Sequence, residues 1–149
     1  VTAPINLAVA GTYYPLISLR LNSSPDNLDA IVILVSMGLL AQGNNYTYNW
    51  QVRKYGTTTG GTWVTPTGSS VSYNITGTSF SGGTSISSGF IASSTQSTTA
   101  LNQLDGSLFK FQLERNSFTS TPYELTLVAA SDTINGKLLA AFDYEEISR

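Results

Sequence analysis

Apolar and polar residues alternate at every second position in several short runs of this chain, and this alternation restricts its fold more than any other feature. A period of two places the apolar side chains on one face of a β-strand, whereas a helix needs a period of about 3.6. No window of the sequence has the pattern of an amphipathic helix. The clearest apolar faces are Ile17, Leu19 and Leu21; Phe109, Phe111 and Leu113; Tyr123, Leu125, Leu127 and Ala129; and Leu138, Ala140, Phe142 and Tyr144.

Turn-forming residues separate these runs. Asp105-Gly106 and Asn135-Gly136 are predicted tight turns, because Asp, Asn and Gly tolerate a positive φ angle. Short strands between closely spaced turns predict an all-β fold, an antiparallel β-sandwich of jelly-roll-like type with about eight or nine strands. A chain of 149 residues suits one domain, which we assign to residues 12–149.

The first 11 residues allow two interpretations. Ile5, Leu7 and Val9 alternate with polar or small residues, so the segment can be the first strand of the sandwich. It can equally be an assembly arm that adds to a sheet edge on a neighbouring subunit, where main-chain hydrogen bonds supply the affinity.

The composition excludes several kinds of chemistry. The chain has no cysteine and no histidine, which removes disulfides, thiolate metal sites and every catalytic arrangement that requires histidine. Asp143, Glu145 and Glu146 are the densest acidic group, and we interpret them as solvated strand residues rather than as a catalytic or calcium-binding pair. We therefore expect no enzymatic activity, no cofactor and no metal.

Charge and hydropathy also limit the partners. The formal net charge is −2, and Arg53-Lys54 is the only adjacent pair of cationic residues, so we expect no binding to nucleic acid. The apolar run at 30–40 is shorter than the ~20 residues of a membrane-spanning helix, so we expect no membrane insertion. Charged residues make up only 11% of the chain. A surface of hydroxyl and amide groups suits an extracellular or virion protein.

The stretch "NYTYNWQVRKYG" at 45–56 raises the question of sugar binding. Tyr48, Trp50 and Val52 alternate strictly with polar residues, which favours the core of a sandwich over a row of sugar-stacking rings. The outer residues Asn49, Gln51 and Arg53 are left as candidates for partner contacts, together with the end of the stretch at 54–56.

The order of the strands resembles a module of tailed-phage virion proteins. The resemblance runs from about Tyr13 to Ile147 through "YYPLISLRL", "LDAIVILV", "NYTYNWQVRK", "GGTWV", "VSYNI", "GGTSISSGF", "FKFQLERNS" and "LLAAFDYEEI". It implies a non-enzymatic structural protein on the virion surface, in a capsid decoration (cement), appendage or tail-fibre protein. Such a protein acts by assembly with copies of itself and with other capsid or tail proteins. We expect a homo-oligomer, in the form of a trimer.

An alternative function is a receptor-binding head that recognises a glycan on the host surface. The loops at 56–62 and 93–103 would then hold the glycan together with Tyr55 or Trp63. Trp63 lies between a glycine pair and a proline, a setting in which a ring can be partly exposed. An accessory carbohydrate-binding domain of a secreted enzyme is a third possibility.

Overall fold

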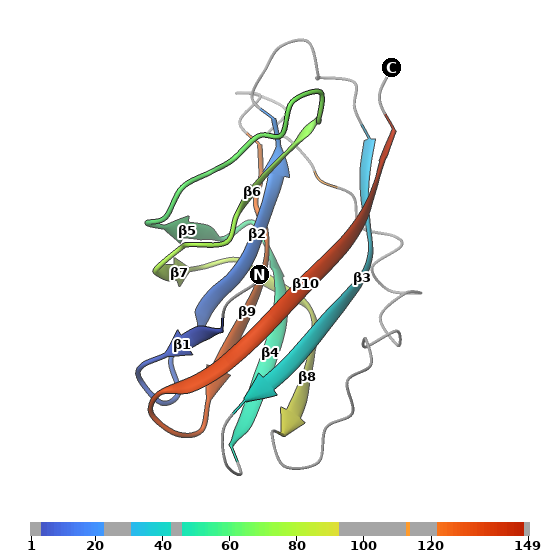
Figure 1. The fold of residues 1–149 in the computed structure, drawn as a ribbon. Coiled ribbons are helices and arrows are strands. Elements are labelled where there is room, and N and C mark those ends of the chain that lie inside the picture. Colours follow the sequence, from blue (N-terminus) through green and yellow to red (C-terminus); the bar gives the residue numbers. More distant parts are fainter. Residues whose placement is uncertain (1–3, 23–30, 43–45, 93–112, 114–121, 148–149) are drawn as a thin grey trace.

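The computed structural model describes residues 4–22, 31–42, 46–92, 113 and 122–147, which form ten strands and, within these ranges, no helix (Figure 1). The predicted all-β class is confirmed. Three strands have only three residues each, too few to show an alternation, and the count therefore exceeds the expected eight or nine. The strands are β1 (Ile5–Leu7), β2 (Tyr14–Leu21), β3 (Ile31–Gln42), β4 (Thr47–Lys54), β5 (Thr57–Thr59), β6 (Val71–Asn74), β7 (Ser79–Ser81), β8 (Thr84–Ala92), β9 (Leu125–Ser131) and β10 (Gly136–Ile147).

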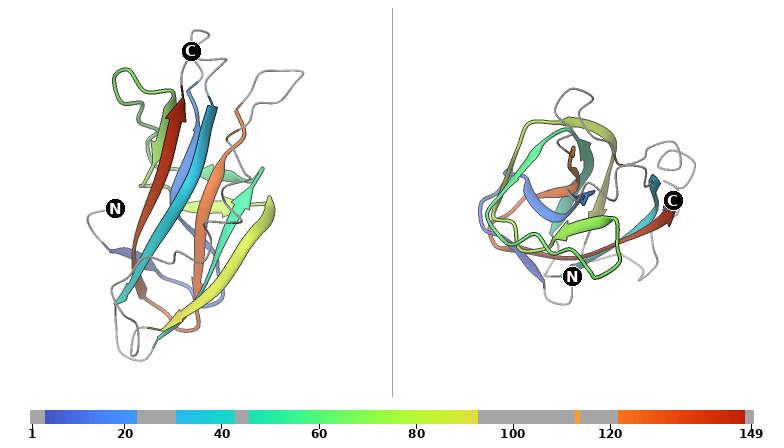
Figure 2. Two further views of the ribbon diagram at one scale, coloured as in Figure 1. Left: turned by 90° about the vertical axis from the view of Figure 1, so that its right-hand side faces the viewer. Right: turned by 90° about the horizontal axis from the view of Figure 1, so that it is seen from above.

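Two antiparallel sheets face each other across the core (Figure 2). One has five strands in the order β6-β2-β9-β4-β8, and the other has three in the order β1-β10-β3. The short strands β5 and β7 form a third, two-stranded sheet. Every pairing between the strands is antiparallel, which confirms the antiparallel sandwich.

The alternation in β4 is the clearest link between sequence and core. Tyr48, Trp50 and Val52 are buried, while the residues between them are exposed or half-buried. The core interpretation of "NYTYNWQVRKYG" is therefore confirmed for these three residues. Burying such large side chains removes extensive apolar surface from water, the main favourable term in folding.

Strands β2 and β9 are buried on both faces, which their alternation did not predict. All residues of β9 are buried, including Thr126 on the face turned away from the core. The two-stranded sheet covers this face, because Thr58 of β5 shares a hydrogen bond of 2.6 Å with Ser18 of β2. Thr126 donates a second hydrogen bond to the Ser18 hydroxyl, at 3.0 Å. A hydroxyl cluster thus joins the two-stranded sheet to the sandwich.

The N-terminal segment lies on its own domain in this structure. Strand β1 pairs with the start of β10, with Ile5 opposite Leu138. Leu7 is buried in the core, whereas Val9 is 54% exposed beyond the end of the strand. The segment therefore occupies the place of a first strand at the edge of the three-stranded sheet.

The predicted turn at Asn135-Gly136 lies between β9 and β10, and Asn135 has a positive φ of 58°. The second predicted turn, at Asp105-Gly106, lies outside the described residues, as do the loop at 93–103, Phe109 and Phe111. Leu113 is buried, and its backbone N–H donates to the carbonyl of Val32 in β3 at 2.9 Å.

Candidate functional site

The outward-facing residues of β4 form a connected row on the outer surface of the five-stranded sheet. Tyr13, which precedes β2, lies across this row. Its hydroxyl group donates a hydrogen bond to Asn49 Oδ1 and accepts one of 3.1 Å from Gln51 Nε2. The Arg53 guanidinium lies 4.7 Å from the centre of the Tyr13 ring, and its Nε donates to Gln51 Oε1 at 2.8 Å. These contacts hold the side chains of the row in fixed orientations.

A pocket of about 250 Å³ opens at one end of this row. It lies where β4 begins, β8 ends and β9 turns into β10, at the lower end of the sandwich in Figure 1. Asp132 is the one charged residue among the described residues that line it. The lining residues are Gly11, Tyr13, Thr47, Asn49, Phe90, Ala130, Ser131 and Asp132.

Backbone hydrogen bonds fix the walls of the pocket. The N–H of Thr47 donates to Asp132 Oδ1 at 3.1 Å, and the N–H of Asp132 donates to the Thr47 carbonyl at 3.0 Å. On the opposite wall, the N–H of Gly11 donates to the Ser131 carbonyl at 2.9 Å. Gly11 has a φ of 75°, which an L-residue adopts only with strain. Three separate parts of the chain are thereby joined around one opening.

Phe90 is the most exposed large apolar side chain of the pocket. It stands on β8 opposite Asn49 and is 76% exposed. Asn49 Nδ2 donates to the Gly89 carbonyl at 3.0 Å, which fixes the backbone just before Phe90. The ring therefore presents a face to solvent from a rigid strand rather than from a loop.

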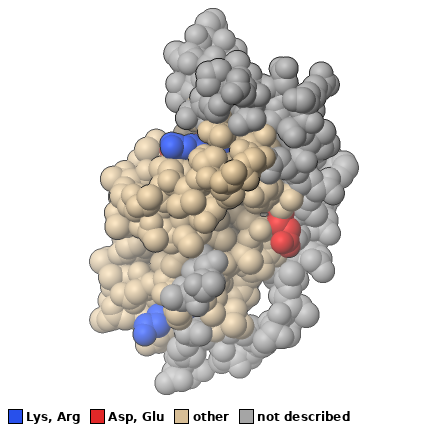
Figure 3. Space-filling view, turned by 45° about the horizontal axis from the view of Figure 1, so that its top comes forward, with Lys and Arg blue, Asp and Glu red and all other residues tan. Residues whose placement is uncertain are grey.

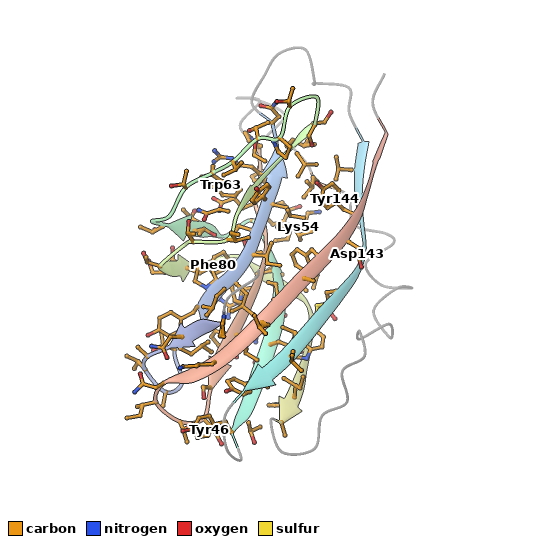
Figure 4. The ribbon with its side chains drawn as sticks, in the orientation of Figure 1. Tyr46, Lys54, Trp63, Phe80, Asp143 and Tyr144 are labelled. Carbon is orange, nitrogen blue, oxygen red and sulfur yellow. The ribbon has the colours of Figure 1, made fainter. Side chains whose placement is uncertain are left out.

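The two residues that the sequence suggested for ligand contact lie elsewhere. Tyr55 follows β4, is 49% exposed and has a φ of 75°. Its ring packs edge-on against Tyr123, with 4.7 Å between ring centres. Trp63 is half-buried beneath the Arg20 guanidinium, 4.0 Å from the ring centre. Neither lines the pocket beneath Phe90, and in Figure 4 Trp63 lies far from Tyr46, the neighbour of Thr47.

Arg20 and Glu124 share the surroundings of Trp63. Burial lowers the pKa of Arg20, and the nearby Glu124 carboxylate acts in the opposite direction. Glu124 Oε1 also accepts a hydrogen bond of 2.9 Å from the N–H of Thr58. The hydrogen bond from Thr58 joins the two-stranded sheet to the residue that precedes β9, so Glu124 contributes to the packing of that sheet.

A second, apolar hollow of about 200 Å³ lies where β10 crosses β2 and β6. Its position between the two sheets makes it the outer margin of the core. The lining residues are Ile17, Leu19, Tyr73, Ile75, Ala141, Phe142 and Tyr144.

Strand β8 forms one edge of the five-stranded sheet. Among the described residues, β4 is the only strand that pairs with it. The nine residues of β8, "TSISSGFIA", include no charge and no proline. The opposite edge differs, because Val64 and Tyr73 exchange backbone hydrogen bonds of 2.8 and 2.9 Å and so cover part of β6.

Among the described residues on the face shown in Figure 3, the side chains of Lys, Arg, Asp and Glu are few. In the ranges that the structure covers, no group of three His, Cys, Asp or Glu residues is placed to hold a metal ion. The same ranges contain no helix of the length and apolarity needed to cross a membrane. Asp143 is exposed on β10, and the side chains of Glu145 and Glu146 lie outside the description.

Sequence reasoning identified Asn49 but missed Tyr13, Phe90 and Asp132 as its neighbours. Phe90 follows two serines and a glycine, so its run lacks a strict alternation of apolar and polar residues. The register between β4 and β8 would have identified Phe90. A residue directly opposite the outward-facing Asn49 must itself point outward. That register cannot be obtained from one strand alone.

Comparisons with protein-family models, with curated proteins and with solved structures find no match to this chain. Its candidate function therefore rests on the residues, the fold and the surfaces described above.

Proposed function

We propose that this protein is a non-enzymatic structural component of a phage virion, located on the particle surface as a capsid decoration or appendage protein. It acts by burying surface against copies of itself and against other capsid or tail proteins. The proposal is supported by the sandwich fold, by the resemblance of the strand order to virion modules, and by one feature of the structure. That feature is the uncharged edge of β8.

An open strand edge is a template for pairing with another chain. Proteins that stay monomeric commonly protect such edges with lysines, prolines, bulges or a covering segment. Strand β8 has a single irregularity, where its register with β4 shifts between Val52 and Arg53. It has none of the charged residues that would repel a second strand. This edge is therefore suited to contact between subunits.

The side chains of β8 also suit such a contact. Ile86 and Ile91 pack against the core and anchor the strand. Ser88 and Phe90 lie on the outer face beside the edge, and both are exposed. A neighbouring strand would gain main-chain hydrogen bonds along β8 without burying an unpaired charge.

The test is the mass of the purified protein in solution, measured by sedimentation equilibrium. We expect a homo-oligomer, with a trimer as the expected form. The Ser88→Glu variant should raise the dissociation constant at least about tenfold, because the contact would bury the added carboxylate without a partner cation. Circular dichroism confirms that the variant is folded.

The matched control is Thr57→Glu, which adds the same charge at an exposed position of β5, away from the β8 edge. It should leave the mass unchanged. A wild-type protein that remains monomeric up to millimolar concentration contradicts assembly through this edge, as does an oligomer that tolerates Ser88→Glu.

A further inference from the structure

We propose that the pocket beneath Phe90 binds one ring of a neutral saccharide. This inference goes beyond the assembly function and does not depend on it. It also places the sugar site away from Tyr55 and Trp63. The argument rests on the shape of the pocket, its available polar groups and its charge.

The pocket combines an apolar wall with a polar rim. Phe90, Tyr13 and Ala130 supply the apolar surface, and Thr47 and Asp132 supply oxygen atoms. A pyranose ring has the same two-sided character: C–H groups that pack on an aromatic face, and hydroxyl groups around its edge. A volume of about 250 Å³ lies below the range of about 300–1,000 Å³ typical of drug-sized ligands, which favours a ligand that inserts a single ring.

The rim offers hydrogen-bonding groups that the described part of the chain does not use. One carboxylate oxygen of Asp132 accepts from the N–H of Thr47. Its second oxygen and the hydroxyl group of Thr47 have no partner among the described residues. An ionised carboxylate accepts strong hydrogen bonds from hydroxyl donors, and a threonine hydroxyl can both donate and accept. Together they can bind two adjacent hydroxyl groups of a sugar.

The charge of the pocket excludes other ligands that stack on aromatic rings. Among the described residues that line it, Asp132 is the only charged one, and none is a lysine or arginine. A nucleotide or an acidic sugar would bring a negative charge next to this carboxylate without a compensating cation. Neutral hexoses and N-acetylhexosamines avoid this repulsion.

The pocket is also preorganised. Hydrogen bonds among Thr47, Asp132, Gly11 and Ser131 fix its walls, and the backbone before Phe90 is held by Asn49. A ligand would therefore bind without ordering a loop, which lowers the entropic cost of binding.

The experiment is an array of neutral oligosaccharides probed with the purified protein, followed by calorimetric titration of the best ligand. Free monosaccharides and polymeric glycans form separate arms, which distinguish a small-molecule source from a cell-surface source. Binding in either arm supports the proposal if it depends on the pocket. Phe90→Ala and Asp132→Asn should each weaken binding about tenfold or more, because one removes the ring and the other the anionic acceptor.

The control is Tyr55→Asn, which removes an exposed ring outside the pocket and supplies a residue that tolerates the positive φ at this position. It should bind as the wild type does. Loss of binding in Tyr55→Asn with full binding in Phe90→Ala would overturn the proposal, as would the absence of any saccharide ligand. Ser88 does not line the pocket, so Ser88→Glu should retain the affinity per site whether or not it assembles.

Discussion

Gly89 shows how a single residue links the core to the candidate site. It stands on β8 between the exposed Phe90 and the bulge, directly opposite Trp50. A Cβ atom at this position would lie 2.6 Å from Trp50 Cζ2, closer than non-bonded carbon atoms approach. The absence of a side chain at Gly89 therefore lets the buried indole lie beneath β8.

We predict that Gly89→Ala destabilises the protein by about 1–3 kcal/mol, because the added methyl group overpacks the core against Trp50. Urea denaturation measures the change. Gly38→Ala is the matched control, since Gly38 also lies in a strand but has nothing within 4 Å of the added atom. Equal stability of the two variants would show that Trp50 can move aside.

Tyr48 makes stability depend on pH in the alkaline range. Burial raises the pKa of its phenol above the usual 10.0, while a hydrogen bond from the N–H of Lys137 opposes this shift. The unfolded chain loses the phenol proton at a lower pH than the folded chain does. The contribution of the Tyr48 phenol to the free energy of unfolding is therefore complete below pH about 10. It falls as the pH rises through the pKa of Tyr48 in the folded protein.

We expect the free energy of unfolding of the wild type to fall above pH about 10, and Tyr48→Phe to reduce the slope of that fall. Thr57→Val, a change without a titrating group at an exposed position of β5, serves as the control and should keep the wild-type slope. Denaturation curves at a series of pH values measure both slopes. An unchanged slope in Tyr48→Phe would show that other groups govern alkaline unfolding.

Among the strands, the two-stranded sheet explains why the sequence predicted the burial of some strand faces and not of others. Strand β4 keeps its alternation because its outer face carries polar residues that contact solvent and one another. In β2 and β9, Ser18 and Thr126 resemble solvent-facing residues, yet the β5–β7 sheet covers them. Three-residue strands carry no detectable period, so this third layer could not be predicted from the sequence.

We predict that the hydroxyl cluster of Ser18, Thr58 and Thr126 stabilises the packing of the β5–β7 sheet on β2 and β9. Thr58→Val should cost about 1 kcal/mol, the net value of one buried hydrogen bond. Ser18→Ala should cost more, about 1–3 kcal/mol, because it leaves two buried hydroxyl groups without their shared partner. Thermal or urea unfolding measures both values, and Thr57→Val at the exposed neighbouring position should be neutral.

A double variant, Ser18→Ala with Thr58→Val, tests whether the hydroxyl groups act together as one cluster or contribute independently to stability. Its cost should be smaller than the sum of the two single changes, since both remove the same hydrogen bond. Strict additivity would contradict the cluster and would indicate that apolar contacts hold the β5–β7 sheet in place.

For the whole molecule, the sequence predicted the class of fold from local patterns and missed the surfaces that depend on register. The pairing of Asn49 with Phe90, and of Thr47 with Asp132, joins residues 41 and 85 positions apart in the chain. The same limit applies to β8, whose place at a sheet edge follows from the order of all five strands. Composition did indicate a surface with few charges, which agrees with the absence of charged residues from β8.

A rigid sandwich carries an uncharged strand edge, which we propose as the assembly contact, and beside it a pocket with an exposed aromatic ring. In a surface protein of a particle, the first would hold subunits together and the second would face the surroundings.

Immuno-electron microscopy tests whether the protein lies on the surface of a virion. Intact particles are labelled with an antibody against the folded domain. On the proposal, a phage encodes this chain, and the measurement uses purified particles of that phage. We expect regularly spaced label on the particle surface, at the capsid or at an appendage. Unlabelled particles, with the protein recovered only from the soluble fraction of the lysate, would contradict a role in the virion.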